Sequence, residues 1–149
     1  MNRLIGFLDL PPFWTLAHIG LATLQASVWS LRFPGQWFAG LVLILAGLVL
    51  TLVAALYLVR ARTTVVPRHE PAVLVTGGPF RLSRNPIYLA DLIILVGWCL
   101  LIGQPLAAIL VVPLYLVLDR RFALPEELGL EAKFGDTFKD YARRVPRWL

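Results

Sequence analysis

The chain alternates between long apolar runs and short polar segments. Four apolar runs, residues 13–31, 37–59, 87–102 and 106–118, contain a single charged residue, Asp91. About 20 apolar residues are needed for a helix to cross a bilayer. The pattern therefore predicts an all-α, polytopic membrane protein with about four transmembrane helices. The fourth run is short for a full crossing, so we expect its helix to continue past Asp119 into the aqueous phase.

The polar segments predict how these helices are connected. Residues 32–35 and 103–105 contain Gly and Pro and predict tight turns, the second of which makes a helical hairpin of the last two spans. After Pro125, residues 126–133 and 136–144 predict short amphipathic helices that are separated by Gly135. We expect one membrane-embedded domain over residues 1–149, with cytoplasmic C-terminal helices over 120–149.

Composition and charge agree with a membrane location. The chain is 58% hydrophobic and only 15% charged, whereas about a quarter of a soluble domain is charged. Its net charge of +5 does not indicate nucleic-acid binding, because the basic residues flank the apolar runs, where orientation and anionic lipids account for them. Their distribution places both termini and the middle loop in the cytoplasm, as in a bacterial-type inner-membrane protein.

Processing and metal chemistry are not indicated. The first apolar run lacks a small-residue cleavage site, so no cleavable signal peptide is expected. The single Cys99 excludes an intramolecular disulfide, and no ligand cluster predicts a metal site. His18 and His69 have no partner at ligand spacing.

The loop over residues 73–88 is unusually rich in Gly, Pro and Arg for a simple connector. Its two glycines, 77 and 78, allow positive φ and close approach of a ligand, and Pro79 then fixes the chain direction. Pro86 is expected in the first turn of the third span with Asn85 as its N-cap. Together with Arg84, this helix start suits an anionic group. The alternative is a juxtamembrane turn whose arginines contact lipid phosphates.

Polar residues continue from this loop into the third span. Tyr88 and Asp91 lie three and six residues after Asn85 and share one helical face. A tyrosine at this level is also a common interfacial anchor. A carboxylate inside a span costs about 3 kcal/mol at the helix centre, so it faces a polar cavity or a partner such as Arg120 or Arg121.

A pair of acids follows the fourth span. Glu126 and Glu127 come directly after Pro125, in what we expect to be the first turn of a helix, where the dipole favours acids. Adjacent helical residues point about 100° apart, so the two carboxylates should have different roles. We expect one to bind a ribose hydroxyl or an α-amino group and the other to pair with an arginine. The alternative is capping alone.

The order of these motifs resembles a known family. Motifs spread over residues 73–148 resemble the isoprenylcysteine carboxyl methyltransferase and phospholipid methyltransferase family. They are Gly78-Pro79-Phe80, Arg84-Asn85-Pro86-Ile87-Tyr88, Glu126-Glu127, Phe134-Gly135 with Phe138 and Tyr141, and Val145-Pro146-Arg147-Trp148. Members are multi-span membrane enzymes that use S-adenosylmethionine.

The resemblance implies a site. Gly78 and Pro79 would shape the cofactor pocket, while Arg84, Asn85 and Tyr88 would contact the cofactor. Glu126 and Glu127 would bind it or hold an arginine. We expect the catalytic residues to be Arg84, Tyr88 and Asp91. The family commonly has histidine where this chain has Asn85, so a proton relay is not expected there, although positioning remains available.

Alternatives remain open at this level. Some membrane sterol and enone reductases, which use NADPH, have a similar C-terminal arrangement of loop and helices. A non-catalytic membrane module is a third possibility. The acceptor would be a lipid or another lipophilic small molecule, with either a carboxylate or an amine as the reacting group. Oligomeric state is open, since Gly40, Gly47 and Ala54 permit close helix packing within or between chains.

Overall fold

The structure is a computed structural model that describes residues 10–26, 31–63 and 72–149. These residues form helices and connecting turns, and no strand occurs among them. The helices are α2 (Pro11–Ala26), α3 (Gln36–Arg60), η1 (Gly78–Arg81), α4 (Pro86–Leu101), η2 (Pro105–Leu110), α5 (Val111–Val117), η3 (Leu118–Ala123), α6 (Leu124–Phe134) and α7 (Asp136–Arg144). The all-α prediction is therefore confirmed for the described part of the chain.

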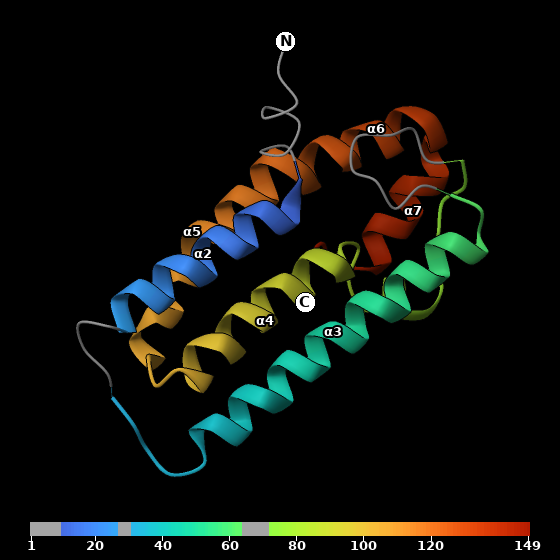
Figure 1. The fold of residues 1–149 in the computed structure, drawn as a ribbon. Coiled ribbons are helices and arrows are strands. Elements are labelled where there is room, and N and C mark those ends of the chain that lie inside the picture. Colours follow the sequence, from blue (N-terminus) through green and yellow to red (C-terminus); the bar gives the residue numbers. More distant parts are fainter. Residues whose placement is uncertain (1–9, 27–30, 64–71) are drawn as a thin grey trace.

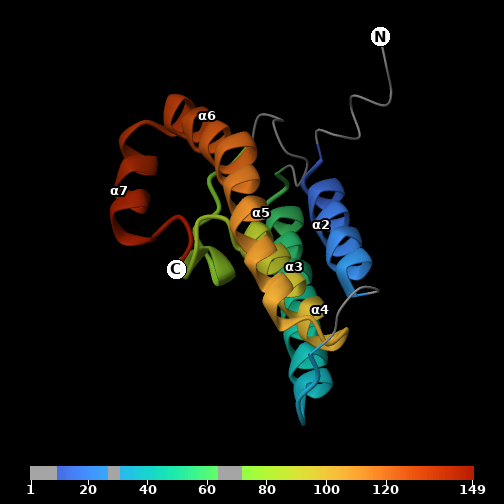
Figure 2. The ribbon, with the colours of Figure 1, turned by 90° about the vertical axis from the view of Figure 1, so that its left-hand side faces the viewer.

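Helix α4 is the centre of the arrangement. Figure 1 shows α2 and α5 along one side of α4 and α3 along the other. Figure 2 shows α5 running into α6, after which α7 folds back beside the start of α4. The main buried core contains residues of α2, α4, η2, α5 and η3, among them Leu95 of α4 and Leu114 of α5, which are fully buried. The fold thus places the C-terminal helices next to the loop that precedes α4.

The contact between α3 and α4 depends on glycine. A Cβ on Gly40 would lie 2.6 Å from the Gly97 carbonyl oxygen, and one on Gly97 would lie 2.8 Å from the Gly40 carbonyl oxygen. Two turns further along α3, a Cβ on Gly47 would lie 3.0 Å from the Ala90 carbonyl oxygen. The small residues expected to allow close packing therefore do so within the chain, against α4.

Only one described helix is both long enough and apolar enough to cross a membrane. That helix is α3, with 25 residues, whereas α4 is apolar but has 16. Four complete spans stay a prediction. Large apolar side chains are nevertheless exposed on four helical elements. They are Leu16, Leu21 and Leu24 of α2, Leu41, Val42, Leu45, Leu48, Val49 and Leu52 of α3, and Leu106, Ile109, Val112 and Leu116 of η2 and α5.

The predicted first span of residues 13–31 is described only in part. Helix α2 covers Pro11–Ala26 of the described residues. Residue 31 is not helical, and residues 27–30 lie outside the described part. The prediction for the C-terminal region is confirmed, because α6 and α7 are separated at Gly135, whose φ is +51°.

The fourth apolar run continues as helix well beyond Asp119, as predicted. Helical structure runs from Pro105 to Phe134, and residues 118–123 form a π-helical turn within it. Ala123 has helical dihedrals of −59° and −48°. Glu126 and Glu127 lie in the first turn of α6, as predicted. Because the π turn before them is already helical, however, no free helix end occurs at this turn.

Candidate functional site

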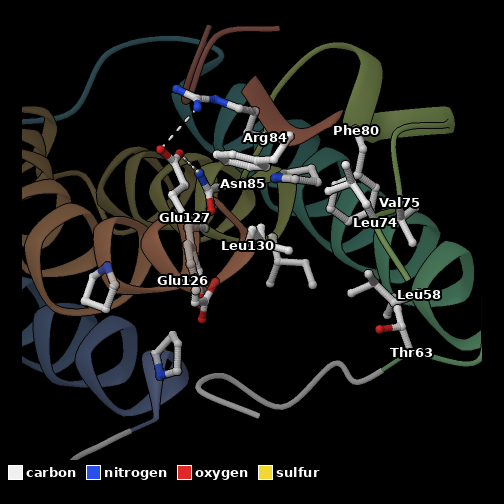
Figure 3. Close-up of a pocket in the computed structure, with 18 of the residues that line it drawn as sticks. Leu58, Thr63, Leu74, Val75, Phe80, Arg84, Asn85, Glu126, Glu127 and Leu130 are labelled. Atoms are coloured by element: carbon white, nitrogen blue, oxygen red, sulfur yellow. Dashed lines mark hydrogen bonds and ion pairs between the residues drawn. The ribbon is translucent and has the colours of Figure 1, made fainter. Parts of the chain in front are cut away.

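The loop before α4 and the acidic pair of α6 meet in space. The Arg84 Nη1 atom lies 3.2 Å from Glu127 Oε2, and the Tyr88 hydroxyl donates to Glu126 Oε1 at 2.5 Å. Figure 3 shows the side chains of Arg84 and Asn85 pointing toward the carboxylate of Glu127. The predicted meeting of the two segments is thus present in the structure.

Glu127 is the centre of an ionic network. Its side chain is 9% exposed and accepts two hydrogen bonds from Arg147, from Nε at 2.9 Å and from Nη2 at 2.8 Å. With Arg84 on its other side, one buried carboxylate binds two guanidinium groups. The pKa of Arg147 is raised, chiefly by the hydrogen bonds to Glu127. Paired, buried charges of this kind hold segments in a fixed geometry.

Asn85 occupies the N-cap position of α4 but does not cap it with its side chain. Its Nδ2 atom lies 3.4 Å from Glu127 Oε1 and 3.4 Å from the Arg147 carbonyl oxygen. The predicted N-cap position of Asn85, with Pro86 in the first turn of α4, is therefore confirmed, but the Asn85 side chain does not make the capping hydrogen bond. The amide is drawn away from the helix end because it satisfies two acceptors in the ionic network.

The C-terminal segment, residues 145–149, is hydrogen-bonded to the loop that precedes α4. The backbone N–H of Arg84 donates to the Pro146 carbonyl at 3.0 Å, and the Ser83 hydroxyl donates to the Arg147 carbonyl at 2.9 Å. Asp119 of the π turn accepts from Arg147 Nη1 at 3.2 Å and from Trp148 Nε1 at 3.0 Å. Arg147 thus links three segments, a role that the sequence motif contained but did not reveal.

A cavity of about 1060 Å³ opens beside this network. This volume is at the upper end of the range for small-molecule sites, roughly 300–1,000 Å³. Its walls are mostly apolar, and its polar side chains are concentrated where α4 faces α6. The polar members are Thr51, Thr63, Arg84, Asn85, Tyr88, Asp91, Glu126, Glu127, Lys133 and Tyr141. Five of the predicted site residues are therefore brought to one cavity by the loop, α4 and α6, and Asp91 joins them from one turn further into α4.

The remaining two predicted residues, Gly78 and Pro79, do not line this cavity. Gly78 has the expected positive φ, +57°, but a Cβ there would lie 2.4 Å from the ring of Tyr57 in α3. The close approach that this glycine allows is made by an aromatic side chain rather than by a ligand. Any influence of Gly78 and Pro79 on the pocket is therefore indirect, through the position of η1.

Asp91 lies between helices rather than beside an arginine. It lines the cavity, and Thr15 of α2 lies near its carboxylate. No residue that the structure describes forms an ion pair with Asp91, and the Arg121 guanidinium lies 5.7 Å from the Trp14 ring centre. Of the two readings left open for Asp91, the structure favours the polar cavity.

Tyr141 of α7, which the sequence offered only as part of the family motif, belongs to the site. It is 4% exposed, lines the cavity, and donates from its hydroxyl to the Phe80 carbonyl oxygen at 2.6 Å. Burial raises the pKa of Tyr141 to about 12, because the charged phenolate would lose its hydration, and Arg84 offsets this only in part. Tyr141 is consequently a neutral donor that holds α7 against η1.

Replacing Tyr141 by phenylalanine tests this contact. Y141F leaves the buried Phe80 carbonyl unpaired, and we expect a loss of about 1–3 kcal/mol in the free energy of unfolding. The raised pKa favours the folded state at and below pH 10, and this contribution is lost as the pH rises from about 10 to about 12. Unfolding measured from pH 7 to pH 12 should show this alkaline decline in the original protein. An equal decline in the variant would contradict the assignment to Tyr141.

Comparison with known proteins assigns this arrangement to a family. The profile of the phospholipid methyltransferase family matches residues 36–137, which contain α3, α4, α6 and most of the cavity lining. A probable protein-S-isoprenylcysteine O-methyltransferase of Oryza sativa subsp. japonica is 33% identical over 138 residues, which cover 85% of this chain and 71% of the rice protein.

Two further relatives are similar to this chain, and one of them is a methyltransferase by name. Protein-S-isoprenylcysteine O-methyltransferase B of Arabidopsis thaliana is 34% identical over 125 residues, covering 76% of this chain and 62% of the plant protein. An uncharacterized protein of Haemophilus influenzae is 41% identical over 63 residues, 42% of this chain and the whole of that protein. From the family match and the long alignments, the chain belongs to the phospholipid methyltransferase family and is a methyltransferase.

Proposed function

We propose that the chain transfers a methyl group from S-adenosylmethionine to a lipophilic acceptor at the cytoplasmic membrane face. The acceptor would carry an isoprenylcysteine-type carboxylate or a phospholipid amine. The observation that carries the proposal is the cavity in which Arg84, Asn85 and Tyr88 of one segment face Glu126 and Glu127 of another, beneath largely apolar walls.

The residues present fit such a donor. Arg84 lines the cavity, and its Nε atom is buried without a hydrogen-bond partner in the described part of the chain, which suits the carboxylate of the donor. Glu126 supplies a carboxylate for a hydroxyl or an amino group. Apolar side chains on the other wall, Leu74, Phe80 and Leu130, suit a flat base.

The position of the cavity suits a lipophilic acceptor as well. One side of the cavity is formed by Leu10 and Pro11 and the other by Ala55 and Leu58 of α3. We propose that the helices form a four-span bundle, so that the exposed leucines and valines of α2, α3 and α5 contact lipid. An acceptor could then enter sideways while the donor enters from the aqueous side. Alignment of the two and exclusion of water would provide the catalysis.

Donor binding is the direct test. Purified protein should bind radiolabelled S-adenosylmethionine saturably, and NADPH should not compete. Arg84→Ala should weaken this binding at least tenfold, because a charge-assisted contact to the donor is lost. The fold should survive this change, since Glu127 keeps its two hydrogen bonds from Arg147.

The matched control is Arg143→Ala. Arg143 pairs with Asp140 on the exposed side of α7 and does not line the cavity, so this variant should bind the donor as the original protein does. Label recovered in the lipid phase after incubation with a prenylated cysteine or phosphatidylethanolamine would identify a product. Absence of saturable donor binding by the folded protein would remove the proposal.

A further inference from the structure

The cavity contains a second polar group, one turn further into the bundle than Tyr88. Three helices supply it: Thr15 from α2, Thr51 from α3 and Asp91 from α4. Asp91 and Thr51 line the cavity. Thr15 is 5% exposed, donates from its hydroxyl to the Pro11 carbonyl oxygen at 3.4 Å, and lies near the Asp91 carboxylate. We call these three residues the deep polar cluster. It lies among apolar helices and is separate from the ionic network around Glu127.

The deep polar cluster is not satisfied by the protein. Asp91 Oδ2 and Thr51 Oγ1 are both buried and have no hydrogen-bond partner among the residues that the structure describes. A buried polar atom without a partner costs free energy, and a carboxylate inside a membrane span is costly even when partly solvated. Such groups occur where a ligand or a substrate completes them. The free lone pairs here call for a hydrogen-bond donor.

We infer that the deep polar cluster binds the amine head of the methyl acceptor, and that Asp91 thereby selects an amine-bearing amphiphile over a carboxylate-bearing one. This inference rests on the proposed function. An ammonium group would be attracted to Asp91 and would donate to both unpartnered oxygens. A carboxylate in the same place would bring a second negative charge into an apolar region and would supply no donor.

The position of Asp91 suits the reaction. Asp91 follows Tyr88 by three residues on the same face of α4, which is a shift of about 4.5 Å along the helix axis. An amine held there would lie beside the end of the cavity where Tyr88 meets Glu126. In-line transfer needs reacting atoms about 3–3.5 Å apart, so neighbouring sites for the two reactants are required.

The chemistry balances without a further reagent. An ammonium acceptor loses one proton to the Asp91 carboxylate and becomes a nucleophilic amine. Its lone pair forms the new N–C bond while the C–S bond of the sulfonium donor breaks, and the electron pair of that bond stays on sulfur. The product is a methylated ammonium, and the proton held by Asp91 leaves to water when the site reopens.

Binding of two probes without the donor tests the inference. Dodecylamine and dodecanoate have the same alkyl chain but opposite head groups. The original protein should bind dodecylamine at least tenfold more tightly than dodecanoate, measured by calorimetry at constant detergent concentration. Asp91→Asn should remove this preference, and Thr51→Val should weaken amine binding severalfold. Asp91→Glu should retain part of the preference, because the charge is kept.

The matched control for Thr51→Val is Thr23→Val. Thr23 also lies in an apolar helix, but its hydroxyl accepts from Trp98 Nε1 at 2.9 Å, away from the cavity. This variant should bind both probes as the original protein does. Circular dichroism and gel filtration establish that each variant is folded, and a variant that does not fold is replaced in the comparison by the other Asp91 substitution.

The outcomes separate this inference from the proposed function. Equal binding of the two probes by the original protein, or an unchanged preference in Asp91→Asn, would overturn the amine assignment while donor binding could still hold. Weaker binding of S-adenosylmethionine by Asp91→Asn with unchanged amine binding would assign Asp91 to the donor instead, and would also overturn it. Failure of donor binding in the original protein would reject the proposed function itself.

Discussion

Glu127→Ala should destabilise the protein by about 3–5 kcal/mol and abolish donor binding. The free energy is lost because Arg84 and Arg147 would both stay largely buried without their common carboxylate. The loop before α4 and the C-terminal segment would then repel each other instead of being joined. Thermal unfolding in detergent, followed by circular dichroism, measures the first effect, and equilibrium binding of labelled S-adenosylmethionine measures the second.

Glu131 offers a control on the same face of α6, one turn further along. Its carboxylate lies 3.7 Å from Lys139 Nζ, and both side chains are about half exposed, so Glu131→Ala should cost less than about 1 kcal/mol. Glu127→Gln should fall between the two, since it keeps one acceptor and loses the charge. Equal stability of the Glu127→Ala and Glu131→Ala proteins would refute the central role of the buried carboxylate.

Gly97→Ala and Gly40→Ala should each prevent the normal packing of α3 against α4. The added methyl groups would lie 2.8 Å and 2.6 Å from carbonyl oxygens of the facing helix, closer than carbon and oxygen can approach. These atoms belong to helix backbones, so the two helices would have to separate along their contact. Overpacking costs about 1–3 kcal/mol even where side chains can adjust, and we expect more here. The measurements are the yield of monodisperse protein and its thermal midpoint.

Gly20→Ala is the control for both glycine variants. Gly20 lies within α2, and no heavy atom occurs within 4 Å of a Cβ placed there. Alanine is favoured over glycine inside a helix by about 0.5–1 kcal/mol, so this variant should be at least as stable as the original protein. If Gly97→Ala folds with an unchanged midpoint, the close helix contact is not required.

The apolar pattern predicted the helical framework well. Runs of leucine and valine without charge can only be helical if they are to lie in lipid, so α3 and α4 were found within about one residue of their limits. Gly135 was recognised as a helix break for a similar reason, because it interrupts an otherwise polar helical pattern. The predicted end of the first span at residue 31 was too late, since residue 31 is not helical, and residues 27–30 lie outside the described part.

The candidate site was predicted as a set of residues rather than as a set of contacts. One of the two adjacent glutamates was expected to pair with an arginine, and in the structure Glu127 pairs with Arg84 while Glu126 accepts from Tyr88. The amide contacts of Asn85 were not predicted, because a residue before Pro86 fits the N-cap pattern whatever its side chain contacts. The contacts of Tyr57 and Arg147 were not predicted either, because long-range contacts leave no periodic signal in the sequence.

The π turn at residues 118–123 has a consequence for how this region tolerates change. It joins α5 to α6, the helix that carries Glu126 and Glu127, with no break in helical structure between them. Each residue advances a helix by about 100°, so loss of a single residue from this turn would rotate Glu126 and Glu127 away from Tyr88 and Arg84 together. The number of residues in this turn therefore sets the rotation of α6 relative to α5, and an insertion or deletion here should disturb the site more than most substitutions would.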